Sequence, residues 1–362
     1  MPQGKYFRIG YGVLLAALII FMLKQIEFVF QPMFTVLQIL FAPIAVAGVL
    51  YYLFRPLVGL LANWIPRGVA ILLLYLSAVG GLTMFILTVG PEVQNQFNSL
   101  INTVPRIVYQ AQVTFINLQE NELIGQFIEQ TDQYTWEELT REAAIVVNDF
   151  VRNIGTNITG YVGTIANFLI VLIIIPFVLY YMLKEGGKAP DQVFRFLSTR
   201  NEHEARRIFN DMDHALSSYI QGQVIVSFCV GVLVYIGYLI IDLDYPLVLA
   251  LVAMFTNVIP FVGPWIGTFP GVVVGLFDSW LMGLLVVIVV VIVQQIESNI
   301  ISPQVMGRKL QIHPVTILLL LLVAGRFGGI LWLILAVPTY AVVKVIASNT
   351  YRLIKLRQAN TD

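Results

Sequence analysis

The sequence predicts an all-α polytopic membrane protein with about six transmembrane helices and two re-entrant helical hairpins in an inverted repeat. Three observations predict this class. The 362 residues are 58% hydrophobic and only 12% charged, and the mean hydropathy is +0.82. That composition is far from the composition of a soluble domain. Long apolar segments recur along the chain, and two of them are broken near the middle by proline and glycine.

Six further apolar segments are predicted to cross the membrane, because their lengths are close to what a bilayer requires. They are Ile9–Leu23, Met33–Phe54, Val69–Val89, Tyr161–Leu183, Val224–Ile241 and Leu281–Ile296. Lys5 and Arg8 precede the first segment, as in a signal peptide, but no small-residue cleavage site follows. We therefore expect this segment to remain as the first span.

The two broken segments are Pro246–Leu276, interrupted at 259–264, and Pro314–Val343, interrupted at 325–329. Each is too long for one span and too short for two. The half Pro246–Ile259 rises about 21 Å, against a hydrocarbon core of roughly 30 Å. Non-helical backbone at that depth persists only where protein or a watery cavity satisfies it. Both segments also carry a proline 24 positions after their opening proline (270 − 246 and 338 − 314). These features predict paired re-entrant hairpins.

Two polar stretches separate the apolar segments. The acidic stretch 91–160 has helical periodicity and is interpreted as an extracytoplasmic helical insertion, and the basic stretch 184–222 as a cytoplasmic amphipathic helix. The remaining units are 1–90, the N-terminal transmembrane helices; 161–183, a further span; 223–346, a core of two helix-plus-hairpin repeats; and 347–362, a cytoplasmic tail.

The distribution of lysine and arginine predicts the orientation. If both hairpins are re-entrant, every basic cluster falls on one side, which is then cytoplasmic. These clusters are Lys5 and Arg8, Arg55 and Arg67, 184–207, Arg308 and Lys309, and 344–357. Both termini are then cytoplasmic, and the first hairpin enters from outside and the second from inside. The units Val224–Leu276 and Leu281–Val343 become inverted-topology repeats.

Several classes of function lack their signatures in this sequence. It has no phosphate-binding loop, no G-x-S-x-G and no H-E-x-x-H, so we predict no enzyme and no cofactor. No basic patch with interleaved aromatics indicates nucleic acid. His203, Asp211, Asp213 and His214 match no metal-ligand spacing and are interpreted as a charged helix surface. The single Cys229 cannot form an intrachain disulfide.

Paired broken segments are the best sequence indicator of a solute site, so the predicted binding residues lie at the hairpin tips and on the helix between them. They are Asn257, Pro260, Gly263, Gln294, Gln295, Glu297, Asn299 and Arg326. Arg326 lies about 18 Å into the membrane and the first tip about 21 Å from the other side, so the tips are expected to overlap near the midplane. Gln294 and Gln295 suit a neutral polar ligand or hydrogen bonds between helices. Glu297 is either a carboxylate that acts in transport or a structural partner of Arg308, Lys309 or Arg326.

A series of short motifs makes the sequence recognisable. They are 218–223 (SYIQGQ), 257–267 (NVIPFVGPWIG), 294–299 (QQIESN), 302–307 (SPQVMG), 313–314 (HP) and 335–338 (LAVP). In this order they resemble the autoinducer-2 exporter family, and 181–185 (YMLKE) looks like that family's motif after its fourth span. The resemblance implies a bacterial inner-membrane transporter without ATP hydrolysis, homo-oligomeric as a pentamer, with elevator-like motion of the hairpin-bearing part. The second hairpin departs from the pattern of that family at Gly328-Gly329, which Trp332 follows.

Three functions from different classes follow. The first is a secondary transporter that exports a small polar solute such as the quorum signal autoinducer-2. The alternative is a monovalent cation (sodium)/proton antiporter, for which Glu297 is the acid within the membrane-embedded repeats. The third is a scaffold for envelope proteins, based on the insertion 91–160, against which the paired hairpins argue. The expected partners are therefore the lipid bilayer, a small polar solute or monovalent cation, and further copies of the chain.

Overall fold

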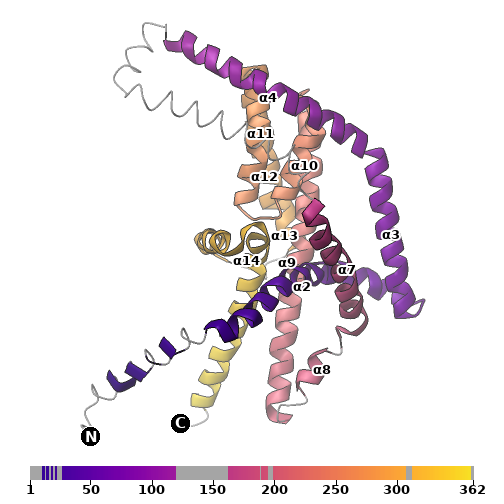
Figure 1. The fold of residues 1–362 in the computed structure, drawn as a ribbon, viewed down its shortest axis with the longest axis vertical. Helices are drawn as coiled ribbons and strands as arrows, with labels where there is room; N and C mark the ends of the chain where they lie inside the picture. Colours follow the sequence, from indigo (N-terminus) through magenta and orange to yellow (C-terminus); the bar gives the residue numbers. More distant parts are fainter. Residues whose placement is uncertain are drawn as a thin grey trace.

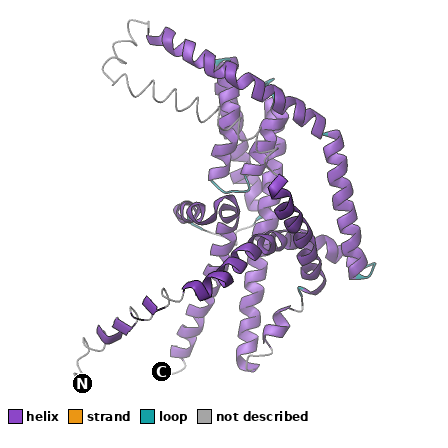
Figure 2. Cartoon of the chain, viewed as in Figure 1, coloured by secondary structure: helices purple, strands orange, loops and turns teal. Residues whose placement is uncertain are grey.

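The computed structural model describes residues 27–119, 162–187, 189–194, 199–306 and 312–359, together with single residues and short pieces between 10 and 22. Every regular element within these ranges is a helix (Figure 2), which confirms the predicted all-α class. About half of the first predicted span therefore lies outside the described residues, as do the part of the insertion from 120 to 160 and the basic residues Arg308 and Lys309.

Three helices form an N-terminal bundle: α2 (Glu27–Ala62), α3 (Arg67–Thr88) and α7 (Val162–Glu185). Small and aliphatic side chains fill its centre. They are Ala47, Tyr51, Val58, Ala70, Ile71, Leu74, Leu179 and Leu183. The hydroxyl of Tyr75 on α3 donates a hydrogen bond of 2.7 Å to the carbonyl oxygen of Pro176 on α7. The bundle is thus held by one apolar cluster and a polar contact between helices.

The helix α4 (Gly90–Gln119) is the described part of the predicted insertion. It leaves the end of α3 and lies across the ends of α10 and α11 (Figure 1). Leu100 on α4 packs against the apolar cluster of those helices. The insertion therefore contacts the core of the protein at Leu100.

The short helix α8 (Ala189–Phe194) is followed by α9 (Thr199–Ile240), a single helix of 42 residues. The sequence analysis separated a cytoplasmic helix ending at 222 from a span beginning at 224, because the composition changes from polar to apolar there. The helical hydrogen bonding continues through Gly222 without a break, since no proline interrupts it. One rigid element therefore connects the polar stretch to the core.

The first hairpin consists of α10 (Pro246–Thr256) and α11 (Val262–Asp278). The break is at 257–261, two residues earlier than the predicted 259–264, because 262–264 already form the first turn of α11. Phe261 has a φ of 62°, so the backbone leaves helical geometry at the turn. The two arms touch at glycines: a Cβ on Gly263 would overlap the main-chain oxygen of Thr256, and one on Gly267 would lie 2.7 Å from Cα of Ala253. Glycine is required at both positions because the backbones approach so closely.

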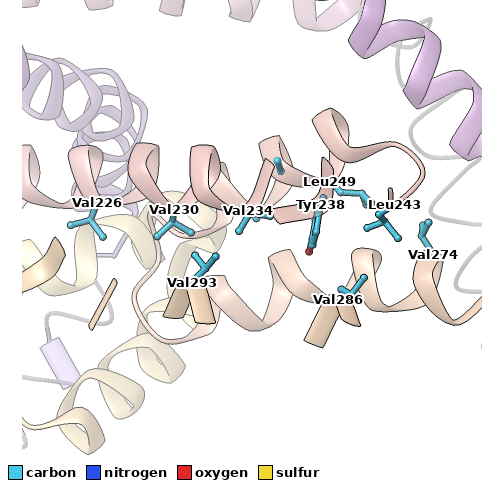
Figure 3. Packing of buried hydrophobic residues seen from close by; sticks show 11 residues of the cluster. Val226, Val230, Val234, Tyr238, Leu243, Leu249, Val274, Val286 and Val293 are labelled. Carbon is cyan, nitrogen blue, oxygen red and sulfur yellow. The ribbon is translucent and has the colours of Figure 1, made fainter. Parts of the chain in front are cut away.

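A valine-rich core holds this hairpin against α9 and α12 (Trp280–Ile296). Val226, Val230 and Val234 recur every four residues along α9 and end at Tyr238, which is fully buried. Figure 3 shows these side chains directed toward Val286 and Val293 on α12. Spacing of four places the four side chains on one face of the helix, so the core is a single seam along α9.

After α12 the chain forms one π-helical turn, η1 (Glu297–Ile301), and then the short helix α13 (Ser302–Val305). A π-helical turn inserts an extra residue into the helix and is often found at functional sites. Met306 lies against Gly222 of α9, where a Cβ would come 2.7 Å from its Cγ. Glu297 therefore lies in a π-helical turn that contacts α9.

The helical run α14 (Pro314–Ala359) contains the second hairpin. Gly329 has a φ of +67°, which is not a helical value. A Cβ on Gly325 would lie 3.5 Å from Cδ2 of Leu333, although residues eight apart are about 12 Å apart along a straight helix. The chain therefore reverses near Gly329, and α14 is not one straight rod in Figure 1.

By length and composition, five helices within the described ranges are suited to cross a membrane: Gln31–Ala62, Arg67–Thr88, Glu202–Ile240, Trp280–Val305 and Gly329–Asn349. The first four contain or closely match predicted spans. The fifth is the second arm of the second hairpin, and its 21 residues make it longer than a half-span. Pro246–Thr256, Val262–Asp278 and Pro314–Arg326 are shorter apolar helices, as expected for the arms of a hairpin.

Candidate functional site

The break of the first hairpin is fixed to α9 by a buried hydrogen bond. The side-chain amide of Gln223 donates to the main-chain oxygen of Asn257, 2.7 Å away. Gln223 is 7% exposed and Asn257 is 2% exposed, so this contact is shielded from solvent. A broken helix leaves carbonyl oxygens without intrahelical donors, and Gln223 supplies one of the missing donors.

Glu297 faces this break from the π-helical turn. The side-chain amides of Asn257 and Gln294 approach its carboxyl group. Its Oε2 atom is nevertheless buried without a hydrogen-bond partner of good geometry, and so is Nδ2 of Asn257. The ion pairs found among the described residues do not include Glu297, so it is not paired with Arg326. Three of the predicted site residues therefore lie together: Asn257, Gln294 and Glu297.

Unpartnered polar atoms accumulate in this part of the molecule. Within the described ranges, five buried side-chain atoms have no hydrogen-bond partner: Oη of Tyr219, Oγ of Ser227, Oη of Tyr238, Nδ2 of Asn257 and Oε2 of Glu297. A buried polar atom that stays unsatisfied costs about 1–3 kcal/mol, so each needs an explanation. The hydroxyl of Tyr238 lies within the valine-rich core, near Gly271. The other four lie on α9, on the hairpin break and on η1.

Three polar residues of α9, spaced by four on one face, are all nearly fully buried: Tyr219, Gln223 and Ser227. Gln223 contacts the break directly, and Tyr219 shares an apolar cluster with Ile259 of the break. The sequence analysis did not include them among the binding residues, although 218–223 belongs to a motif of the resemblance. Their spacing within an otherwise apolar seam is the signal that could have identified them. We call Tyr219, Gln223 and Ser227 the polar face of α9.

Both hairpins reach this polar face. Ile259 from the break of the first hairpin and Leu321, Ala324 and Val337 from the second hairpin belong to one apolar cluster, which also contains Tyr219. Aliphatic side chains of this cluster thus pack around Tyr219, at one end of the polar face. Residues of the two hairpins therefore share one cluster on α9, while the overlap of their tips near the midplane stays a prediction.

The other predicted residues are placed differently. Pro260 is half-buried in the break, and Gly263 packs against Thr256, so both shape the turn. Gln295 is exposed, and its Oε1 accepts a hydrogen bond of 2.9 Å from Nδ2 of Asn299, which is also exposed. This pair lies apart from Asn257. Arg326 is exposed on the second hairpin. Whether any of the eight residues binds a solute stays a prediction.

Among the described residues, no group of three histidine, cysteine, aspartate or glutamate side chains could hold a metal ion. Asp213, considered above for such a site, instead forms an ion pair with Arg55 on α2, with Oδ2 and Nη1 separated by 2.6 Å. Arg55 also lies over the ring of Tyr51, 5.7 Å from its centroid. Asp213 therefore connects α9 to the N-terminal bundle.

Comparison with known proteins identifies the family. A family profile described as "AI-2E family transporter" matches residues 11–352. The chain belongs to the AI-2E transporter family. It is 41% identical over 346 residues to the Bacillus subtilis (strain 168) protein named "Putative transport protein YueF", covering 96% of this chain and 94% of that protein. It is 29% identical over 350 residues to "Putative transport protein YrrI" of the same organism, covering 94% and 95%. "Putative permease PerM" of Escherichia coli (strain K12) is 26% identical over 215 residues, 58% of this chain and 59% of that protein.

Family membership and the apolar helices together identify the chain as a multi-pass membrane protein of a transporter family. The predicted resemblance is confirmed over nearly the whole chain. The buried polar face of α9 and the break of the first hairpin therefore belong to a membrane-embedded AI-2E family transporter, where unpaired polar groups are costly and usually serve a pathway.

Proposed function

We propose that this AI-2E family protein is a secondary transporter that exports a small polar solute such as autoinducer-2 across the bacterial inner membrane, without chemical conversion of the solute. The observation that carries the proposal is the group of buried polar atoms on Tyr219, Ser227, Asn257 and Glu297 that form no hydrogen bond of good geometry, of which the Asn257 amide and the Glu297 carboxyl group approach each other. They comprise hydroxyl groups, an amide donor and a carboxylate acceptor. A solute with both donors and acceptors would satisfy them.

The extent of the site favours a solute over a single bare ion. Tyr219 and Ser227 are eight residues apart on α9, which corresponds to about 12 Å along the helix axis. One ion cannot contact both, since oxygen ligands lie about 2–2.6 Å from a metal cation. A polyatomic solute, or a solute that moves between successive positions, fits this spacing better.

An elevator-like movement of the hairpin-bearing part is part of the proposal. The apolar cluster of α2, α3 and α7 and the valine-rich core of α9–α12 have no residue in common. Separate cores suit two bodies that move against each other. The contacts that α2 makes outside these cores, the Arg55–Asp213 ion pair and the packing of Val49 and Tyr52 on the cluster of the second hairpin, would have to rearrange in that movement. We further propose that both hairpins are re-entrant and inverted, that both termini are cytoplasmic, and that the protein is a pentamer.

A monovalent cation/proton antiporter is the second candidate, and one observation favours it. Glu297 presents a buried carboxylate oxygen without a partner, and an ionisable group in a membrane protein is by default a functional candidate. An antiporter needs a carboxylate that binds a proton and a cation in turn, which a bulky neutral solute does not require.

The test uses purified protein in liposomes, with autoinducer-2 and sodium compared under imposed pH gradients. Asn257→Ala should lower transport of the solute about 5-fold, as expected for loss of one hydrogen bond to it. Asn98→Ala, an exposed asparagine on α4, is the matched control and should transport as the wild type does. Sodium flux that depends on the pH gradient, without solute transport, would select the antiporter.

A further inference from the structure

The first hairpin begins with a helix terminus that its own sequence does not cap. Tyr245 precedes α10 in a left-handed conformation with a φ of 58°, and its side chain makes no capping hydrogen bond. Pro246 occupies the first helical position, where its missing N–H costs nothing. The N–H groups of Leu247 and Val248 still need acceptors, because the first four N–H groups of a helix have none within it.

Gln96 of α4 supplies that acceptor from about 150 residues away in the sequence. Its Oε1 accepts hydrogen bonds from the N–H of Leu247 at 3.1 Å and of Val248 at 3.3 Å. The side chain of Gln96 on α4 thus caps the N-terminus of α10, as an N-cap residue would. The amide of Gln96 is itself oriented, because its Nε2 donates to Oε1 of Glu92 at 2.8 Å.

Two further contacts hold α4 on the same end of the hairpin. The hydroxyl groups of Thr103 and Tyr245 lie 3.1 Å apart, within hydrogen-bonding distance. Leu100 packs on the valine-rich core. Gln96, Leu100 and Thr103 are spaced by four and three residues, so they share one face of α4. That face is directed at the start of α10, and Figure 1 shows α4 lying over it.

The far end of α10 carries the candidate site. The helix has 11 residues, which is about 16 Å, and it ends one residue before Asn257. A short helix moves as one piece, so a restraint on Leu247 and Val248 also restrains the break that carries Asn257. α4 is placed to control the first hairpin from its outer end.

We propose that α4 is a strap that regulates the first hairpin: it holds the hairpin while Gln96 caps α10, and the hairpin moves only when Gln96 releases Leu247 and Val248. The claim about hairpin motion stands on the contacts alone, and its consequence for transport rests on the proposed function. Glu92 and Thr103 act as positioning residues for the strap, through Gln96 and Tyr245.

The first experiment measures amide hydrogen exchange of the full chain in liposomes. Gln96→Ala should speed exchange at Leu247 and Val248 about 2- to 30-fold, the range expected for loss of an N-cap. A strap also requires faster exchange at the break, residues 257–262. Gln94→Ala, at an exposed glutamine two residues before Gln96 and so on the opposite side of α4, is the matched control and should change neither. Faster exchange at 247–248 with no change at 257–262 would mean that Gln96 caps α10 only locally, and it would overturn the proposal that α4 restrains the hairpin.

The second experiment locks the strap. In a Cys229→Ser background, a short bifunctional thiol reagent that reduction can cleave should join Gln96→Cys to the half-buried Leu247→Cys, and should not join Gln94→Cys to Leu247→Cys. Cross-linking should stop solute flux in the first pair, and reductive cleavage should restore it. Full flux with the cross-link formed would overturn the proposal. If the wild type moves neither autoinducer-2 nor sodium, the proposed function fails, while the exchange experiment still decides on the strap.

Discussion

The side-chain amide of Gln223 lies 2.7 Å from the main-chain oxygen of Asn257, and this bond joins the middle of α9 to the break of the first hairpin. Within the described residues, this hydrogen bond links the buried face of α9 to the non-helical backbone at 257–261. Because α9 also carries the ion pair to α2, Gln223 lies between the N-terminal bundle and the candidate site. Its loss should affect both stability and transport.

Gln223→Leu keeps the volume of the side chain and removes the donor. The oxygen of Asn257 would then be buried without a partner, which costs about 1–3 kcal/mol. We expect a lower melting temperature in detergent and impaired solute transport. Gln94→Leu, at an exposed position of α4, should change neither property. Unchanged stability in Gln223→Leu would mean that the bond contributes little to holding the break.

Gly263→Ala should destabilise the protein strongly, because the added methyl group would overlap the main-chain oxygen of Thr256. Overpacking against backbone costs about 1–3 kcal/mol and cannot be relieved by a rotamer change. Gly80→Ala and Gly81→Ala are the controls, since no atom lies within 4 Å of a Cβ at either position. They should be neutral or slightly stabilising, because alanine favours a helix. Melting temperatures of the three variants decide the matter; equal values would mean that the hairpin arms are not in contact.

Arg55 and Asp213 should show a measurable but small coupling energy. Their side chains are 40% and 17% exposed, so solvent screens the pair in part. A double-mutant cycle with Arg55→Gln and Asp213→Asn should give about 0.5–1.5 kcal/mol. Reversal of the charges, Arg55→Asp with Asp213→Arg, should recover part of the stability lost in either single reversal. Strict additivity would show that α2 and α9 are not held by this pair.

How much of this arrangement can be predicted depends on what each residue does locally. Pro260 and Gly263 act through their own backbone, so the position of the first hairpin is readable from the sequence. The second turn, at Gly329, is readable for the same reason. Gln294 and Gln295 differ in which face of the helix they occupy, and Gln294 lies three residues before Glu297, on the same face. The π-helical turn that begins at Glu297 has no clear local signature.

The acceptor role of Gln96 is a harder case. It depends on a contact with Leu247 and Val248 across about 150 residues, and one polar side chain on an amphipathic helix carries no mark of its partner. The change from polar to apolar composition at 222 indicates where α9 enters the core, but it does not interrupt a helix. Composition therefore suggested a boundary that the backbone of α9 does not have.

The proposed orientation is testable by cysteine labelling in intact cells. In a Cys229→Ser background, Gln94→Cys should react with an impermeant thiol reagent, and Glu204→Cys should not. Ser348→Cys tests the second hairpin, because Gly329–Asn349 is long enough to cross the membrane by itself. A re-entrant hairpin keeps position 348 inaccessible from outside. Labelling of Ser348→Cys in intact cells would make that arm a full span.

Glu297 separates the two candidate functions, and stability and transport must be measured together. If Glu297 were one member of a buried ion pair, Glu297→Gln would leave the other charge unpaired and cost about 3–5 kcal/mol. Within the described residues it forms no ion pair, and its Oε2 has no partner. Removal of an unpaired buried charge should therefore leave the melting temperature unchanged or raise it.

Transport by the same variant then identifies the function. An exporter of a neutral solute should keep most of its flux in Glu297→Gln, because the glutamine still offers an oxygen acceptor, and should lose it in Gln294→Ala, which removes an amide at the site. An antiporter should lose all pH-dependent sodium flux in Glu297→Gln, because the amide cannot exchange a proton for a cation. A sharp fall in the melting temperature of Glu297→Gln would contradict the unpaired carboxylate and indicate a structural partner. We expect the pattern of the neutral-solute exporter. The polar face of α9 extends over about 12 Å, which is longer than the binding of a single cation requires.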